Sequence, residues 1–376
     1  MWPFILWLEA LMNTLDYTCV FGVDYQDART KFLDSADRVA GRITTYRHPD
    51  ETGPSGEELA IDVARLGSAD APRQLVIISG THGLEGLSGS ASQVAWLHTI
   101  AADALPPDTS VLLVHALNPW GFAHGSRTTE NNVDLNRNFV DHSERYPENT
   151  GFSEFAPHML PQDWTPQAFD QLNRAIADYC EAHGADAQFD ALTRGQYDHP
   201  QAINFGGSKR EWSNLTLEAI AREHLGAAQK IGFIDWHTGI GEWGESFFLC
   251  FNSDGSPEQD QAVKWWGEAR ILGQRPLGLQ RPNYQGLVFS GLSAFLGERP
   301  MVGAVVEFGT RGREMRRALQ LDIWLKFRAR GDSPKIRMLR EDMHDAFVPV
   351  SSSWRERTSA QAVTITDEAL KGLSNW

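Results

Sequence analysis

The sequence predicts an α/β fold in which a mixed, mostly parallel central sheet is flanked by helices. Short apolar runs typical of buried strands alternate with longer segments of helical periodicity. Such alternation is typical of parallel sheets covered by helices. Polar or ionisable residues close several of the apolar runs, as expected at the carboxyl ends of strands in open α/β sheets. The chain has 376 residues, of which 41% are hydrophobic, so it can bury a large core.

The first half of the chain supplies most of the predicted sheet. Residues 24–40 are expected to form a helix, which precedes a strand at Glu58–Leu66. Strands at 73–79 and 110–117 bracket a helix at 89–102, giving a strand–helix–strand unit. The two strands of such a unit pair in parallel, and a parallel or mixed sheet follows.

The second half is predicted to hold a long insertion and then to return to the sheet. The strand pattern is lost over residues 141–229, which contain several prolines, so we expect a helical, loop-rich insertion with helices at 166–183 and 211–229. The later elements are strands at 231–236, 246–251 and 302–308, a helix at 264–273 and an amphipathic surface helix at 311–330.

These elements predict one large domain with short additions at both ends. Residues 1–22 are expected to form an N-terminal extension, residues 23–350 a single α/β domain that contains the insertion, and residues 351–376 a polar C-terminal tail. The apolar start of the chain lacks a basic region and is too short to span a bilayer. It is either a buried helix or an extension that translation from Met12 would omit.

Composition narrows the classes of function. The net charge of -15 and the pI near 5.2 argue against a nucleic-acid partner, because such proteins carry a basic footprint. The three cysteines lie far apart without a Cys-x-x-Cys motif, which indicates neither disulfides nor a thiolate zinc site and fits a reducing, cytoplasmic location. No membrane association is expected, and the oligomeric state is not indicated.

The motif His82-Gly-Leu-Glu85 is the main candidate for a functional site. It follows the apolar run 75–78 where a strand should end, and the glycines at 80, 83 and 86 allow a tight turn. A histidine and a carboxylate three residues apart can face one metal ion, although a hydrogen-bonded polar turn is the alternative. A second copy, His48-Pro-Asp-Glu51, sits in a turn-rich stretch and is expected to be a solvated loop.

Four further segments follow His82 in a fixed order. They are Asn118-Pro-Trp-Gly, Asp134-Leu-Asn-Arg-Asn-Phe139, a lone histidine at His237 and a glutamate at Glu307. This order resembles that of the zinc carboxypeptidase superfamily, over about residues 73–310. Finer features, such as Asp235-Trp-His-Thr-Gly, resemble a poorly characterised bacterial branch of that superfamily. The resemblance implies a zinc carboxypeptidase-like α/β fold.

The resemblance implies one catalytic Zn²⁺ per chain, held by His82, Glu85 and His237. Two histidines, one glutamate and an open position form a usual catalytic zinc site. The alternative for His237 is a core histidine satisfied by a backbone carbonyl. Glu307 would then be the general base that works with zinc-activated water. Its alternative is a strand-end carboxylate paired with an arginine such as Arg311.

The resemblance also implies roles for four residues around the metal. Arg127 is the candidate for stabilising the oxyanion, although a loop arginine is usually solvated. Arg137 can grip a substrate carboxylate through two parallel hydrogen bonds, with Asn136 as a neutral donor. The alternative is that Arg137 holds a loop through backbone carbonyls. Tyr284 lies in the interval where the superfamily often has a mobile substrate-binding tyrosine.

The function that these residues favour is hydrolysis of an amide bond next to a free carboxylate. The Gly-x-Ser-x-Gly motif of serine hydrolases and the His-Glu-x-x-His motif of many zinc proteases are both absent from the sequence. A carboxypeptidase-like metallopeptidase is the main hypothesis, with a peptide as substrate. An N-acyl amino acid deacylase resembling aspartoacylase and succinylglutamate desuccinylase is the alternative. A non-catalytic binding protein on the same fold is the third.

Overall fold

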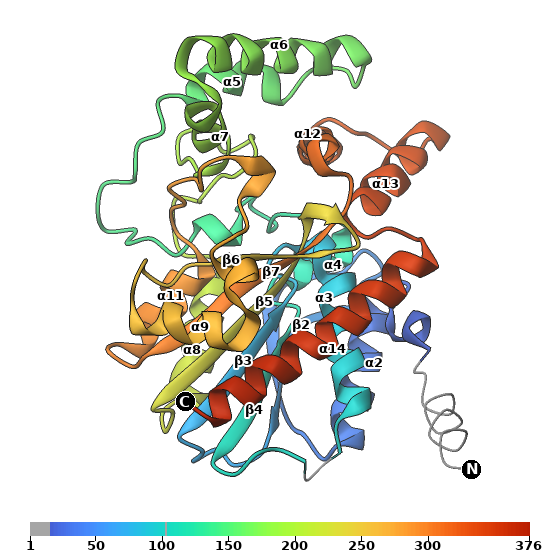
Figure 1. Cartoon of the computed structure of the whole chain (residues 1–376). Coiled ribbons are helices and arrows are strands. Elements are labelled where there is room, and N and C mark those ends of the chain that lie inside the picture. Colours follow the sequence, from blue (N-terminus) through green and yellow to red (C-terminus); the bar gives the residue numbers. More distant parts are fainter. Residues whose placement is uncertain (1–15, 102–103) are drawn as a thin grey trace, which may run out of the picture.

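A seven-stranded sheet runs through the centre of the molecule (Figure 1). The computed structural model describes residues 16–101 and 104–376, so most of the expected N-terminal extension, with Met1 and Met12, lies outside the described residues. The strand order is β1-β2-β4-β3-β5-β7-β6. The strands are β1 (Arg42–Thr52), β2 (Glu58–Leu66), β3 (Arg73–Ser79), β4 (Thr109–His115), β5 (Lys230–Trp243), β6 (Ser246–Cys250) and β7 (Met301–Gly309).

The centre of the sheet is parallel and its edges are antiparallel. Strands β4, β3, β5 and β7 pair in parallel, while β1, β2 and β6 pair antiparallel with their neighbours. Every residue of β4 and β7 is buried, as expected for strands covered on both faces. The prediction of a mixed sheet flanked by helices is therefore confirmed.

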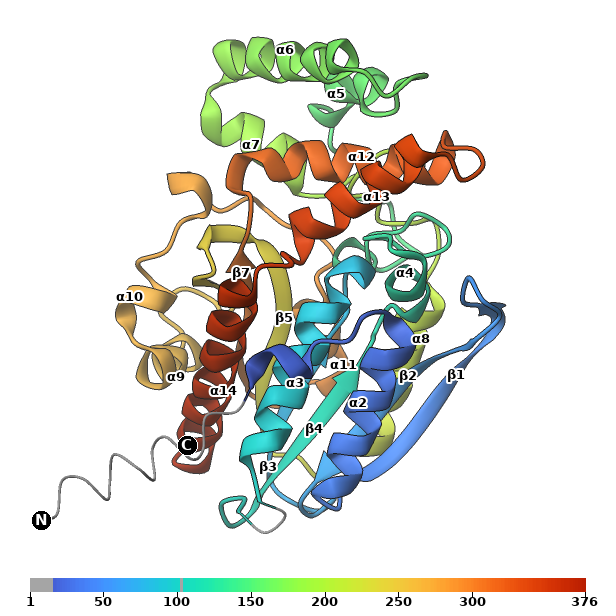
Figure 2. The same ribbon diagram turned by 90° about the vertical axis from the view of Figure 1, so that its right-hand side faces the viewer.

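Helices cover both faces of this sheet (Figures 1 and 2). Because side chains alternate along a strand, Leu75 and Ile77 of β3 join one core cluster while Val76 and Ile78 join the other. The first cluster includes α2 (Tyr25–Arg38), α3 (Gly86–Thr99), α9 (Pro257–Trp266) and α14 (Ser352–Ser374). The second includes α8 (Trp212–His224) and α11 (Val288–Leu296).

The expected insertion forms a small helical unit beyond the carboxyl end of the sheet (Figure 1). Helices α5 (Phe152–Met159), α6 (Pro166–His183) and α7 (Ala185–Thr193) share a core cluster that also takes in Ile323 of α12 (Met315–Phe327). The predicted helices at 166–183 and 211–229 are present as α6 and α8. Helix α8, however, packs on the sheet and belongs to the main core.

Helix starts follow local capping chemistry. Helices α6, α9 and α13 (Pro334–Phe347) each begin with a Ser or Thr followed by proline, at Thr165, Ser256 and Ser333. Each hydroxyl accepts a hydrogen bond from a backbone N–H of the first turn, and proline fits the first helical position because it has no N–H to satisfy. The shorter elements are α4 (Pro119–His124), α10 (Glu268–Ile271), η1 (Tyr17–Val20), η2 (Gly83–Glu85), η3 (Leu135–Arg137), η4 (Pro276–Gly278) and η5 (Gly312–Glu314).

Two expectations from the sequence are wrong. The segment expected to be a polar tail forms α14, whose buried face includes Trp354, Ala362 and Ile365. The second His-x-x-Glu copy, His48 to Glu51, lies in the edge strand β1 and not in a loop. Among the described residues, no helix has the length and apolar character needed to cross a membrane.

Candidate metal centre and substrate cavity

The candidate site lies at the carboxyl ends of the neighbouring parallel strands β3, β5 and β7. The turn after β3 carries His82 and Glu85, β5 carries His237, and β7 carries Glu307. His237 and Glu307 are register partners on adjacent strands, so their side chains leave the sheet side by side. The open α/β architecture thus collects at one edge four groups from three segments that are far apart in the sequence.

The turn that carries His82 depends on two different properties of glycine. Gly80 has φ +69°, a left-handed conformation that favours glycine. Gly83 packs against α4 so closely that a Cβ there would lie 2.2 Å from the carbonyl carbon of Gly121. Asn118 caps α4 by accepting a hydrogen bond from the Gly121 N–H at 2.9 Å. The Asn118-Pro-Trp-Gly segment therefore forms the surface against which the His82 turn packs.

His82, Glu85 and His237 converge on one point and are all buried. Nδ1 of His82 lies 3.0 Å from Glu85 Oε1 and 3.1 Å from Nδ1 of His237. Nδ1 of His237 lies 3.3 Å from Glu85 Oε2, which also accepts a hydrogen bond from the Thr238 N–H. The structure brings all three proposed ligands together.

Each histidine is supported on its far side by a buried carboxylate. His82 Nε2 lies 3.0 Å from Asp134 Oδ1, and His237 Nε2 lies 2.9 Å from Asp235 Oδ2. A carboxylate at Nε2 favours the tautomer whose Nδ1 lone pair points toward the other ligands. Thr81 fixes Asp235 by donating its hydroxyl to that carboxylate.

The ionisable groups of the centre have strongly shifted pKa values. Burial favours the neutral form of Glu85, but the neighbouring His82 and His237 outweigh it and lower the pKa of Glu85. Burial likewise opposes protonation of His237, yet the Asp235 and Glu85 carboxylates raise its pKa well above the ordinary value. Groups shifted in this way by burial and specific charges are typical of functional sites.

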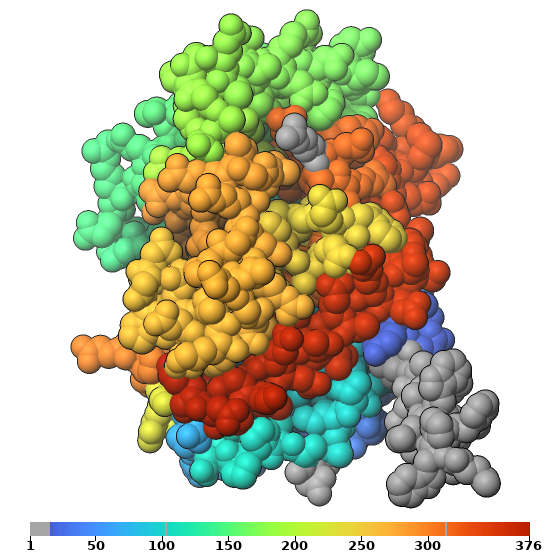
Figure 3. Space-filling view, viewed as in Figure 1, coloured from blue at the N-terminus to red at the C-terminus, as the bar shows by residue number. Residues whose placement is uncertain are grey.

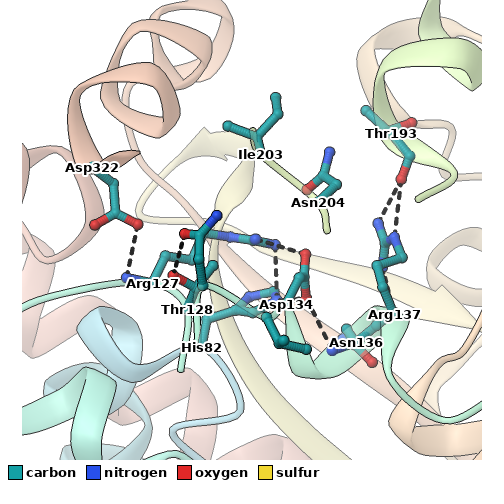
Figure 4. Close-up of polar contacts among 12 residues, drawn as sticks. His82, Arg127, Thr128, Asp134, Asn136, Arg137, Thr193, Ile203, Asn204 and Asp322 are labelled. Carbon is teal, nitrogen blue, oxygen red and sulfur yellow. Dashed lines mark hydrogen bonds and ion pairs between the residues drawn. The ribbon is translucent and has the colours of Figure 1, made fainter. Parts of the chain in front are cut away.

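Arg127 lies against His82, one of the candidate metal ligands, and is buried rather than solvated (Figure 4). Its Nη1 donates to Asp134 Oδ2 at 2.7 Å, and its Nη2 lies 2.8 Å from His82 Nε2. Its backbone N–H donates to Asp322 Oδ2 of α12 at 3.0 Å. Four residues further along α12, Lys326 donates to the Thr128 hydroxyl at 2.8 Å. Asp322 and Lys326 of a distant helix therefore hold the loop that carries Arg127.

Glu307 is buried beside the centre. Burial raises the pKa of Glu307 to about 7, and the negative charge of Glu85 adds to the shift. Its Oε2 accepts a hydrogen bond from the Ile240 N–H at 3.3 Å. The expected alternative partner, Arg311, instead forms ion pairs with Asp342 and Asp345.

Asn136, Arg137 and Tyr284 line the same cavity. Arg137 donates from Nε and Nη2 to the carbonyl of Thr193 and from Nη1 to the carbonyl of Asn136 (Figure 4). The alternative noted from the sequence, an arginine that holds backbone carbonyls, is therefore present. The guanidinium also lies 5.0 Å from the ring centre of Tyr284. Asn136 accepts a hydrogen bond from the Val288 N–H through its side-chain oxygen.

The cavity above the centre has a volume of about 460 Å³. Its base contains His82, Glu85, His237, Glu307 and Arg127, while most of its remaining wall is apolar. Pockets of this size and composition are typical of small-molecule sites.

A protein-family model matches residues 21–361, which is most of the chain. Its description is a protein of unknown function, DUF2817. The chain belongs to the DUF2817 family. No protein in the comparison with curated proteins matches this DUF2817 chain.

Several solved structures are similar to the DUF2817 chain. Bovine thrombin-activatable fibrinolysis inhibitor, solved in complex with tick carboxypeptidase inhibitor, is 10% identical with a TM-score of 0.53, over 94% of this chain and 98% of that chain. A metallo-carboxypeptidase from Pseudomonas aeruginosa is 13% identical with a TM-score of 0.39, over 92% and 68% of the two chains. A putative succinylglutamate desuccinylase/aspartoacylase from Shewanella frigidimarina is 16% identical with a TM-score of 0.37, over 82% and 73%. The first match confirms the carboxypeptidase-like fold that the motif order predicts.

Sequence reasoning missed three carboxylates of the DUF2817 site, and one of them had a local signal. Asp235 stands two residues before His237 on a strand, where side chains two apart share a face. Asp134 was part of a recognised motif, but its contact with His82 joins two loops. Asp322 contacts the Arg127 loop from 195 residues away.

Proposed function

We propose that this DUF2817 chain is a zinc-dependent hydrolase that cleaves an amide bond next to a free carboxylate, as a carboxypeptidase-like metallopeptidase. The observation that carries the proposal is the convergence of His82, Glu85 and His237, with Glu307 in register beside His237. The order of motifs in the sequence supports the same conclusion.

The donor set fits a zinc ion. Two imidazole nitrogens and a carboxylate with an open side toward a cavity are the ligands of a catalytic zinc site. A tetrahedral ion with bonds of about 2.0–2.1 Å separates its ligand atoms by about 3.3 Å. Here the two Nδ1 atoms lie 3.1 Å apart, His82 Nδ1 lies 3.0 Å from Glu85 Oε1, and His237 Nδ1 lies 3.3 Å from the other carboxylate oxygen, Oε2. When bound, zinc would polarise the amide carbonyl and acidify a water molecule.

Glu307 is the proposed general base and acid. It receives the proton of the attacking water and delivers it to the leaving amine. A carboxyl with a pKa of about 7 can perform both transfers near neutral pH. Arg127 donates to the oxygen that becomes negative in the transition state, in a buried position where such a hydrogen bond is strong.

Arg137 is the proposed anchor for the substrate carboxylate. Described residues engage three of its five N–H groups, which leaves one N–H on each terminal nitrogen. Two such groups suit the two oxygens of a carboxylate. The hydrogen bonds to Thr193 and Asn136 hold the guanidinium in place, so the structural and binding roles are compatible.

A deacylase that releases an amino acid from an N-acyl amino acid is the second candidate. The observation that favours it is that residues of α7 and of the segment 276–287 help to wall the cavity. An amide of small size fits such a cavity better than a long peptide.

Elemental analysis beside a hydrolysis assay tests the proposal. Wild-type protein should contain about one zinc per chain, and His82→Ala and His237→Ala should lose it. Glu307→Gln should keep the zinc and lose hydrolysis of peptides and N-acyl amino acids. Absence of metal from wild type, even after zinc is resupplied, would refute the hydrolase and favour a non-catalytic binding protein. Normal turnover by Glu307→Gln would refute the assigned base.

A further inference from the structure

The cavity has two chemically different halves. Most of the charged groups come from the ends of the sheet strands and the loops next to them, and Arg316 of α12 is the exception. Away from these groups the wall is built largely by apolar side chains of other elements, including Phe189, Leu192, Ile203, Phe251, Met315 and Leu319. A ligand that fills both halves must itself have one polar end and one apolar end.

The apolar wall is part of a packed core. Leu192 and Ile203 are buried members of the cluster that joins α5, α6 and α7, and Leu319 of α12 packs against the same cluster. Phe189 of α7 is only half-buried, although it lines the cavity. The wall is therefore supported from behind, and Phe189 offers its ring to a ligand.

The backbone carbonyls at the end of α7 are already satisfied within the protein. The carbonyl of Leu192 accepts a hydrogen bond from Asn204 Nδ2 at 2.8 Å, and the carbonyl of Thr193 accepts from Arg137. The Thr193 hydroxyl donates to the carbonyl of Phe189 at 2.7 Å. The end of α7, where helix carbonyls usually need partners, therefore offers the cavity mainly carbon atoms.

A second segment is tied to α7 above the sheet. The backbone N–H groups of Gln280 and Asn283 donate to the carboxylates of Asp186 and Asp190 at 2.8 and 2.7 Å. In the space-filling view this orange segment lies directly below the green insertion (Figure 3). Because Leu277 and Leu279 also line the cavity, these contacts bound its volume of about 460 Å³.

We infer that the substrate is a small amide that carries one carboxylate and one large apolar group, and that the wall around Phe189 selects the apolar group. This inference rests on the proposed function for the reaction, but the binding preference can be measured without turnover. The apolar group can belong to the acyl part or to the amino acid part. In both cases the substrate presents an apolar group to the wall.

Two substrate series on zinc-loaded protein test the preference and separate the two sources. One series lengthens the acyl group from acetyl to octanoyl on a fixed amino acid, and the other keeps an acetyl group and enlarges the side chain from alanine to phenylalanine. In the series that enlarges the part of the substrate bound by the wall, kcat/KM should rise about fourfold per added methylene, because each buried methylene contributes about 0.8 kcal/mol. Equal or falling values in both series would overturn the inference while leaving the hydrolase intact.

Variants of Phe189 connect the preference to the wall. Phe189→Gln should lower kcat/KM for the best apolar substrate about tenfold more than it lowers kcat/KM for the acetyl compound, with unchanged zinc content. Phe189→Leu should restore most of the loss. The matched control is Leu215→Gln, because Leu215 is 49% exposed on α8 and does not line the cavity. An equal loss on the acetyl and the apolar substrate would contradict a selective role.

Protection of Cys180 from alkylation measures binding independently of catalysis. Cys180 lines the cavity, and the exposed Cys19 serves as the internal reference. Phenylbutyrate should slow alkylation of Cys180 and not of Cys19, whereas acetate should have no effect. Protection without turnover of any amide would uphold the binding preference and refute the proposed hydrolase. Lack of protection by phenylbutyrate, or equal protection by acetate, would overturn the inference.

Discussion

Removing the charge of Asp235 should weaken metal binding without disturbing the fold. Asp235 is fully buried, and its Oδ2 lies 2.9 Å from His237 Nε2. Asparagine has the same shape and can still accept a hydrogen bond from Thr81 through its one oxygen. The loss is therefore mainly the negative charge that makes His237 a better ligand. Loss of such a supporting partner typically lowers metal affinity about 10–100-fold, or about 1.4–2.7 kcal/mol.

Asp235 is a cleaner choice than the second supporting carboxylate. Asp134 also pairs with Arg127 at 2.7 Å, so Asp134→Asn would leave a buried guanidinium without its closest anion. Asp235 has only the Thr81 hydroxyl and His237 as described side-chain partners. Its substitution should therefore report on the metal site with little effect on the neighbouring loop.

The assay is a competition for zinc between the metal-free protein and a chromophoric chelator. Circular dichroism before and after chelation confirms that wild type and variant have the same fold. The matched control is Asp62→Asn, since Asp62 is equally buried in an ion pair with Arg29 at 2.6 Å but is remote from the ligands. The control should lower stability and leave zinc affinity unchanged. An affinity of Asp235→Asn within about threefold of wild type would refute the supporting role.

Three further predictions test other parts of the structure. Asp322→Asn should lower kcat about tenfold at unchanged zinc content, because it loosens the Arg127 backbone; an unchanged kcat would contradict this. Burial lowers the pKa of His115 to about 4, below its ordinary value of 6.5. On acidification, His115 therefore takes up a proton in the unfolded chain before it does so in the folded protein. Between pH 6.5 and pH 4, the free energy of unfolding of wild type should fall by about 3 kcal/mol more than that of His115→Asn; an equal fall for both proteins in urea unfolding would refute this. Trp354→Ala should cost about 3–5 kcal/mol in urea unfolding, and a loss below about 1 kcal/mol would contradict the buried role of α14.

The sheet and the clustering of His82, Glu85 and His237 could be predicted because their signals are local. A buried parallel strand is a short apolar run, and its carboxyl end is marked by the first polar residue. Glu307 stands at such a position and His82 follows another within four residues, so strand prediction and site prediction depend on the same pattern. The glycines around His82 were informative for the same reason, since tight turns restrict the residue type.

The errors arose where the local pattern was weak. The buried face of α14 contains Thr358, Ser359 and Thr366 among its apolar residues, so its composition is polar although its periodicity is helical. Strand β1 contains Pro49, which is tolerated because β1 is an edge strand whose register shifts between Arg47 and Thr52. In both cases tertiary packing overrides the composition on which the expectation rested.

The contacts that tune the site could not be predicted, because they depend on tertiary structure. Asp322 reaches Arg127 only after α12 has packed against the loop. The apolar wall depends in the same way on how the insertion folds over the strand ends. The ionisable residues at strand ends therefore predict which reaction is possible. Substrate specificity instead depends on segments, such as the insertion, whose sequence carries no strong pattern.

The buried charged groups around the candidate site have an excess of negative charge. Four buried carboxylates face two buried guanidinium groups, namely Glu85, Asp134, Asp235 and Glu307 against Arg127 and Arg137. The difference is two negative charges, which a divalent cation would offset. Protons are the competing source of positive charge, because the Asp235 and Glu85 carboxylates raise the pKa of His237 well above its ordinary value. Zinc binding should therefore release protons from the site and strengthen as pH rises.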